Sequence, residues 1–461
     1  MVSLKHPRLS GLGRNPAAPE DVLVRLAAHK AGRDGLAMRQ GQLPDAVVEA
    51  LLTHGDGIDA TVRLRTDRLS PAMRRRIAEH PDPAVRDARA DFVRHSVDTG
   101  VPVGVDALEE TYGRFRTALA EDPDPKLRAA VARDWHDRPA SVQAALLADP
   151  DPLVRGAATN HERPGVPPKW RDRCLADPAT RANVASYVPL TADQFERLVQ
   201  LMRADDEEAE DLQYCVARNP HLTADMVARL LDFDDPAVRA AVAQSRHVDA
   251  ETRDRLYALL EAESANGNTG ARLALTWNFT EPSWLREAPL DERLTYLDCP
   301  YPVFRRVLAT CRDLPEEAWQ RLDDDPDLLV RRAAARRPDT PPHVLERLIR
   351  GHGDVFHVRP LLVEHPNFPR HTLRTLVDEP DPHVHYVALQ DPELPVPALQ
   401  RLAAATSEPF VRRGVARHPN ITDPLLDQLL SDPDPNVADD AAANAALRPA
   451  RMYGILSDAA L

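Results

Sequence analysis

Apolar residues recur along this chain in short clusters with helical spacing. After Asp124 and Pro125, the apolar residues Leu127, Ala130 and Val131 stand at positions i, i+3 and i+4 of one stretch. The same spacing returns at Val238, Ala241 and Val242. Residues spaced in this way lie on one face of an α-helix. Aspartate is a favoured helix cap, and proline fits the first turn because its missing N–H would have no partner there. We therefore predict that a short helix begins at each such Asp-Pro pair.

A second apolar cluster follows each of these helices, after a turn that contains proline. Thr340 and Pro341 are expected to cap and open one such second helix. Its predicted apolar face holds Val344, Leu345 and Leu348. In another copy, Thr191 and Gln194 have the spacing of a capping box, in which each side chain bonds to the backbone of the other residue. Each unit is therefore predicted to contain two short helices.

The units follow one another at a nearly constant interval. The aliphatic residue of the first helix recurs after 27 residues from Leu127 to Val154, after 27 from Val384 to Val411, and after 26 from Val411 to Val437. Isolated helices shorter than about 12 residues are marginal in water, so each pair must bury its apolar face against its neighbours. We predict an all-α superhelical solenoid of paired short helices, some of them 3-10 helices, with a repeat of about 26–28 residues.

The repeating unit resembles the variant leucine-rich repeat (LRV) family of bacteria. The best matches are residues 325–349 and 408–430, and residues 15–28 match the second half of a unit. The resemblance implies a right-handed superhelix that is similar in shape to HEAT and armadillo arrays. Some members of the family carry a cysteine-rich iron–sulfur module before the repeats. No cysteine precedes Cys174 here, so the resemblance implies no cluster, and we expect no cofactor.

The regular pattern sets the expected organisation of the chain. Residues 1–14 are expected to form a flexible N-terminal segment, and residues 15–461 a continuous solenoid. Two stretches, near 91–120 and 262–300, interrupt the period, and residues 351–353 form a smaller break. Such departures from the repeat are better places to look for function than the regular units, which maintain the stack.

An arginine follows the aliphatic residue in many units, and stacking would align these arginines as a ladder. The ladder comprises Arg128, Arg155, Arg239, Arg331 and Arg412. One interpretation is a basic stripe that binds phosphate or an acidic peptide. The other is structural, in which each arginine pairs with an aspartate of its own or the next unit. The formal net charge of −14 opposes a phosphate-binding groove and favours the structural interpretation.

Aromatic residues gather between positions 277 and 304, within the second irregular stretch. The candidates for contact with a partner are Trp277, Trp284, Tyr296 and Tyr301. If exposed, they would form a patch of the kind that anchors protein interfaces. The alternative is that they fill the core of a degenerate unit, which is where large aromatic side chains usually lie. We favour the alternative and retain the patch as the candidate site.

Other potential chemistry in the sequence is weak. Seven of the 17 histidines fall between His343 and His385, but no cysteine or glutamate constellation accompanies them, so no metal site is expected. The acidic run from Asp205 to Asp211 is interpreted as a solvated face, with docking of a basic segment as the alternative. No nucleotide-binding, metalloprotease or nucleophile-elbow motif occurs, so no catalytic residue is proposed.

These observations predict a non-catalytic scaffold that binds a protein or peptide on the surface of the repeat array. The alternative is a nucleic-acid-binding repeat protein, including a base-excision activity like that of some HEAT-like DNA glycosylases. A third possibility is an enzyme or metal protein that works through the histidine-rich segment. No apolar run is long enough to span a membrane, so a cytoplasmic protein is expected.

Overall fold

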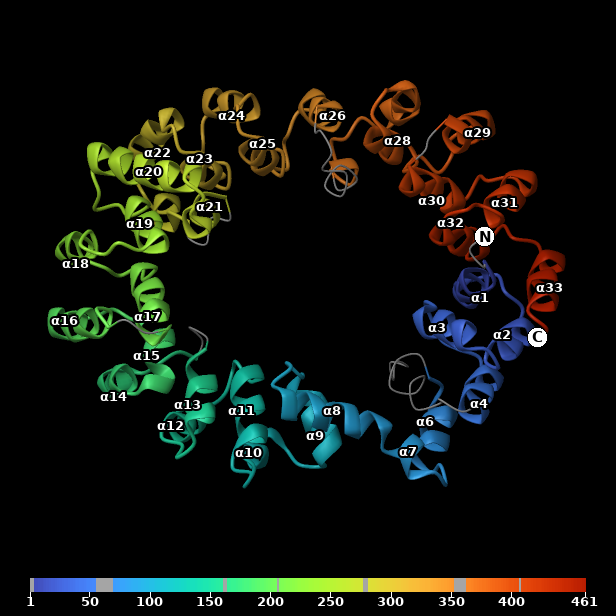
Figure 1. Cartoon of the computed structure of the whole chain (residues 1–461), viewed down its shortest axis with the longest axis horizontal. Helices are drawn as coiled ribbons and strands as arrows, with labels where there is room; N and C mark the ends of the chain where they lie inside the picture. The colour runs from blue at the N-terminus through green and yellow to red at the C-terminus, as the bar shows by residue number, and fades with distance from the viewer. Residues whose placement is uncertain are drawn as a thin grey trace. The chain divides into compact units, whose positions relative to one another are not determined.

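All regular elements in the described part of the chain are helices (Figure 1). The computed structural model describes residues 4–54, 69–160, 164–204, 207–276, 281–351, 362–405 and 408–461. Within these ranges no strand occurs, most helices are short, and some, such as η2 (Pro168–Trp170), are 3-10 helices. The prediction of an all-α protein built from many short helices is confirmed. None of the described helices has both the length and the apolar character needed to cross a bilayer.

The chain divides into two compact units, and we name each by its place in the sequence. The central unit consists of residues 93–334. The terminal unit combines residues 1–92 with residues 335–461.

The central unit consists of helix pairs whose members form two rows (Figure 1). Along most of the unit, the first helix of one pair packs on the first helix of the next. These first helices are α11 (Pro125–Asp134), α13 (Pro152–Thr159), α15 (Pro178–Ala185), α17 (Glu207–Ala217), α19 (Pro236–Ala243), α21 (Thr269–Thr276), α23 (Pro302–Leu308) and α25 (Leu328–Ala334). The second row contains α10 (Arg116–Leu119), α12 (Ala140–Leu147), α14 (Arg171–Ala176), α16 (Ala192–Leu201), α18 (Ala224–Leu230), α20 (Ala250–Ala265), α22 (Leu290–Thr295) and α24 (Glu316–Asp323).

Side-chain caps follow the predicted pattern at several first helices, where an aspartate caps a helix that has proline in its first turn. The Asp124 carboxylate accepts the Lys126 N–H at 2.9 Å, with Pro125 in the first turn of α11. The capping box between Thr191 and Gln194 is also present at the start of α16. These two predictions are confirmed.

The predicted Thr340 cap is wrong. The helix α26 (Pro342–Arg350) begins after Pro341 and has no side-chain cap. Instead, the Thr340 hydroxyl donates to the backbone carbonyls of Ala335 and Arg337, at 3.1 and 2.7 Å. The buried hydroxyl therefore closes the turn before the helix. A sequence motif cannot distinguish these two uses of threonine, because both satisfy nearby backbone groups.

The core of the central unit is built from the predicted apolar stripes. Leu127, Val131, Val154 and Val238 are all buried, and small alanines beside them let neighbouring helices approach closely. Full burial of such a side chain stabilises the fold by about 1.5–3 kcal/mol. Phe304 occupies the corresponding position in α23 and is also fully buried. The stack is thus held by one continuous apolar layer between its two rows.

The two irregular stretches are helical in their described residues but depart from the paired pattern. The first contains α8 (Ala88–Thr99) and α9 (Val105–Tyr112), which precede the short helix α10. The second begins in α20, which has 16 residues and is longer than the neighbouring second helices. It continues through the 3-10 helices η3 (Ser283–Arg286) and η4 (Tyr296–Asp298).

The terminal unit has the same helix-pair construction. Its N-terminal segment provides α1 (Lys5–Arg14), α2 (Glu20–Leu26), α3 (Lys30–Met38), α4 (Asp45–Thr53), α6 (Pro71–Ala78) and α7 (Pro83–Arg86). Its C-terminal segment provides α26, η5 (Arg370–Asp378), α28 (Pro382–Ala388), α29 (Val396–Ala405), α30 (Pro409–Arg417), α31 (Asp423–Leu430), α32 (Pro435–Ala442) and α33 (Pro449–Asp458).

Residues 1–14 were expected to be flexible, and this expectation is wrong for the described residues 4–14. They form α1, which packs on α3 on one side and on α32 on the other, and Leu9 and Leu12 are fully buried. The physical reason is that the segment carries its own apolar stripe. The glycines between its apolar residues make this stripe hard to recognise in the sequence. Gly11 allows the closest approach, since a Cβ atom there would lie well inside van der Waals contact of the Asp439 carbonyl oxygen.

The first repeat therefore stacks on the last repeat, by the same contacts that join consecutive repeats. The Asn444 side-chain amide donates to the carbonyls of Ala416 and His418 in the preceding repeat, at 2.7 and 3.2 Å. In the same way, the Asn15 amide donates to the carbonyls of Ala442 and Asn444, at 2.9 and 2.7 Å. Asn15 and Asn444 are both buried. The N-terminal repeat thus covers the apolar face that the last repeat would otherwise expose.

This stacking predicts that Gly11→Ala destabilises the protein. The added methyl group would press on the backbone of α32, and such overpacking costs about 1–3 kcal/mol. We expect a lower thermal unfolding midpoint, measured by circular dichroism. Gly454→Ala in α33 is the matched control, because a Cβ atom there meets no atom within 4 Å. Equal midpoints for the two variants would show that α1 does not pack on α32 as described.

Candidate functional site

Arginine side chains join consecutive repeats of the central unit through two sets of hydrogen bonds. Arg128 donates from Nε and Nη2 to the two carboxylate oxygens of Asp149, each at 2.8 Å. Its Nη1 donates to the backbone carbonyls of Asp122 and Pro123, at 2.7 and 3.1 Å. One guanidinium therefore holds the Asp-Pro turn of its own repeat to that of the next. We call this arrangement an arginine clamp.

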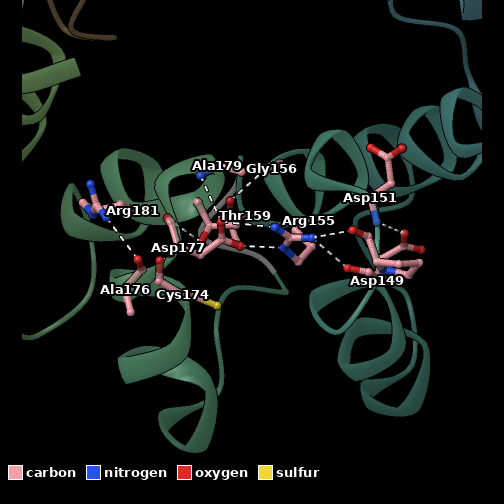
Figure 2. A network of polar contacts seen from close by, with 12 residues as sticks. Asp149, Asp151, Arg155, Gly156, Thr159, Cys174, Ala176, Asp177, Ala179 and Arg181 are labelled. Carbon is pink, nitrogen blue, oxygen red and sulfur yellow. Dashed lines mark hydrogen bonds and ion pairs between the residues drawn. The ribbon is translucent and has the colours of Figure 1, made fainter. Parts of the chain in front are cut away.

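The next clamp continues from the same aspartate (Figure 2). Arg155 donates to the Asp149 carbonyl at 2.9 Å and to the Asp177 carboxylate at 2.5 and 3.2 Å. Asp149 thus receives one arginine on its carboxylate and another on its carbonyl. It also accepts the Asp151 N–H at 2.9 Å, which fixes the turn that leads into α13. The clamps form a continuous chain of polar contacts across three repeats.

Both members of each clamp are held in their charged forms. Hydrogen bonding to Asp177 raises the pKa of Arg155, and the same contact lowers the pKa of Asp177. Burial by itself would raise the pKa of Asp149, but hydrogen bonds from Arg128 and from the Asp151 N–H leave it lowered. These side chains are less than one fifth exposed. The arginines and aspartates of the clamps therefore neutralise one another, and their charges are not available to a ligand.

The other three arginines of the predicted ladder also have partners within the chain. Asp234 and Glu263 accept from Arg239, the Asp325 and Pro326 carbonyls from Arg331, and the Asp432 carboxylate from Arg412. Arg239 and Arg412 thus pair with carboxylates of the same or the next unit, as in the structural interpretation, whereas Arg331 donates to backbone carbonyls of its own unit.

Arg305 makes a further clamp that the sequence reasoning missed. It donates to the Asp325 carboxylate at 2.6 and 3.0 Å and to the Cys299 carbonyl. The signal was present, because Pro302 and Arg305 have the spacing of the motif. The motif was not recognised because Phe304 replaces the usual valine before the arginine.

The described aromatic candidates pack partly into the central unit. The Tyr301 ring stacks on Tyr257 with centroids 3.7 Å apart, and the Tyr296 ring stacks on Phe304 at 5.1 Å. The Tyr301 hydroxyl lies 2.7 Å from a carboxylate oxygen of Asp254 and donates to it. These tyrosines are half-buried and lie against the apolar core, as expected of residues that complete a degenerate unit.

Trp284 combines a structural contact with an open surface. Its indole N–H donates to the Gln244 carbonyl at 2.9 Å, and its ring meets Tyr296 edge-on at 5.6 Å. It also lines a hollow of about 480 Å³ that opens beside η3. Trp277, the fourth aromatic candidate, lies outside the described residues.

Two histidines of the histidine-rich segment, His365 and His385, bond to backbone carbonyls, as does His418 beyond it. His365 and His418 bond through Nε2 to carbonyls of preceding repeats, those of Arg337 and Asp391, each at 2.8 Å. His385 bonds to the Glu379 carbonyl. Within the described ranges, no group of three or more His, Cys, Asp or Glu side chains is arranged to hold a metal ion.

The acidic run and the third break are described only in part, whereas all four cysteines lie within the described residues. Asp205 and Asp206 of the acidic run, and residues 352 and 353 of the third break, lie outside the described residues. Glu208 of the acidic run forms an ion pair with Arg181 at 2.6 Å. The four cysteines are free thiols, and burial raises the pKa of Cys174.

The clamp geometry predicts that Arg155→Ala destabilises the protein. A hydrogen bond to a charged partner contributes about 1.5–3 kcal/mol, and the substitution also leaves Asp177 largely buried without its counter-charge. Thermal unfolding monitored by circular dichroism should show a clearly lowered midpoint. The control is Arg197→Ala, which removes a highly exposed ion pair with Asp172 worth about 0–1 kcal/mol. Similar midpoints for the two variants would argue against the clamp.

The lowered carboxylate pKa values predict how stability depends on pH. A carboxylate whose pKa is lower in the folded state stabilises the protein above the unfolded value of about 4 and loses this effect as the pH falls further. Asp149 and Asp177 behave in this way. The temperature of the unfolding midpoint should therefore decrease as the pH is lowered below about 4. Arg155→Ala should flatten this dependence, and parallel curves for the two proteins would contradict it.

Residues 328–352 match the family model described as leucine rich repeat variant. No curated protein matches the chain in a sequence comparison. The matched segment contains α25 and α26, joined by the turn at Thr340. The resemblance predicted from the sequence is thus confirmed at this unit, and the helical repeats of the chain are compatible with it. Residues 328–352 are a repeat of the leucine rich repeat variant type.

Proposed function

We propose that the protein is a non-catalytic scaffold that binds a protein or peptide on the surface of its helical repeat array. The observation that carries the proposal is that recurring positions and turn positions of the central unit have different roles. The recurring positions are used for stacking, as in the clamps of Arg128 and Arg155. The turns between helices instead carry side chains that differ from repeat to repeat, such as Arg218 and Pro220 in one turn and Gln244 and Arg246 in the next. A rigid stack with variable turns is suited to recognition.

The use of the recurring arginines for stacking favours a protein partner over a nucleic acid. A phosphate-binding track needs many cationic groups with no partner of their own. The ladder arginines donate to carboxylates or carbonyls of the chain, and the formal net charge is −14. A protein or peptide surface of mixed polarity does not require such a track. We also propose a cytoplasmic location, a setting in which four free cysteines would stay reduced.

The proposal predicts that the tagged full-length chain captures a specific protein from nuclease-treated extract of its native host. We expect chemical cross-links from the partner to fall on the turns of the repeats, since these carry the variable side chains. Val154→Asp is the control, because a charge in a fully buried position disrupts the stack and should abolish capture. Recovery of nucleic acid alone from untreated extract, or substrate turnover by the purified chain, would overturn the proposal.

A further inference from the structure

A hollow in the central unit lies where the regular repeat is broken. The turn between α17 and α18, the turn between α19 and α20, and the 3-10 helix η3 together enclose about 480 Å³. Its polar lining includes Arg218, His221, Arg246, His247, Trp284 and Arg286. The first two turns belong to consecutive repeats, and η3 adds a wall that the regular repeats lack.

The turns that form the floor of the hollow are rigid. The Asn219 amide donates to the carbonyls of Ala185 and Val188, each at 2.7 Å, and its side-chain oxygen accepts the His221 N–H at 2.8 Å. In the next repeat, Ser245 accepts the His247 N–H in the equivalent position, at 3.2 Å. The two histidines are thus presented by equivalent turns. A preformed site of this kind loses little freedom when it binds a ligand.

Two arginines at the hollow differ from the clamp arginines. Arg218 lies over the ring of Tyr214, 4.9 Å from its centroid, and Arg246 lies over the ring of Trp284 at 5.7 Å. Both are exposed, and neither forms an ion pair within the described part of the chain. A guanidinium that lies over an aromatic ring can still donate its N–H groups to a ligand. Both guanidinium groups are exposed at the same hollow.

The rest of the lining has mixed charge. Arg286 is already paired with Glu281 at 2.7 Å, and Glu287 is also exposed at the hollow. Carboxylates at the rim would repel the continuous negative charge of a nucleic acid backbone. They can instead accept backbone N–H groups or pair with a lysine of a peptide. A peptide also supplies isolated carboxylates, which match the planar fork of each guanidinium.

We propose that this hollow binds a peptide segment that carries carboxylate side chains. Arg218 and Arg246 each bind a carboxylate through guanidinium N–H groups, while Trp284 lines the hollow beside Arg246. Trp284 stays in place because its indole N–H is bonded to the Gln244 carbonyl. The inference rests on the proposed function and assigns it a site and a class of ligand.

The test is a binding titration of the full-length chain with a short fluorescent peptide in which Glu alternates with Gly. A peptide with Gln in place of Glu and an oligothymidylate of equal length serve as comparisons. We expect the Glu peptide to bind, and Arg218→Ala with Arg246→Ala to weaken it by at least about tenfold. The control is Arg203→Ala with Arg255→Ala, which removes two exposed arginines outside the hollow and should change the affinity less than about twofold.

Each alternative outcome overturns the inference in a distinct way. If the two double variants bound the Glu peptide with equal affinity, the peptide would bind elsewhere on the chain. The scaffold function would then still stand. Equal binding of the Gln peptide would exclude recognition of carboxylates. Stronger binding of the oligothymidylate, lost in the Arg218 and Arg246 variant, would assign the hollow to nucleic acid. No binding of the Glu peptide would remove the site, whereas capture of a partner tests the scaffold function separately.

Discussion

The arginine clamp is the contact on which the stacking of the repeats depends. A helix pair of this size cannot bury its apolar stripe alone, so its position relative to the next pair must be fixed. The apolar layer supplies most of the free energy but little direction, because burial of apolar surface is non-directional. A bidentate contact such as Arg128 to Asp149 supplies the direction. Asp149 also shapes its own turn and holds Arg155, which reaches Asp177 of the following repeat, so the contacts run through three repeats.

The terminal unit applies the same rule to the two ends of the chain. Repeat arrays need a polar repeat at each end, because the last stacking face is otherwise exposed. Here α1 occupies that face of α32, and Asn15 bonds to the last repeat as Asn444 bonds to the one before it. Ion pairing of Arg14 with Asp439 and the Tyr453 bond to Asp21 add polar contacts at the same junction. The ends of this chain are therefore covered by each other.

The sequence was most informative where one residue type recurs for one physical reason. Asp124 as a cap, the valine stripe and the partners of Arg155 all follow from spacing and elementary capping chemistry. It was least informative about contacts between distant segments. The helix α1 was missed because its role depends on α32, more than 400 residues away in the sequence. The hollow was missed because it exists only where η3 meets two turns of the preceding repeats.

A double-mutant cycle between Arg128 and Asp149 tests the central claim most directly. Arg128→Met keeps the aliphatic stem, and Asp149→Asn keeps an oxygen that can accept the Asp151 N–H. Unfolding free energies of the two single variants and the double variant would be measured in urea. The clamp predicts a coupling energy of about 1–3 kcal/mol between the two positions. Additive effects within about 0.3–0.5 kcal/mol would contradict it, because the two side chains would then act independently.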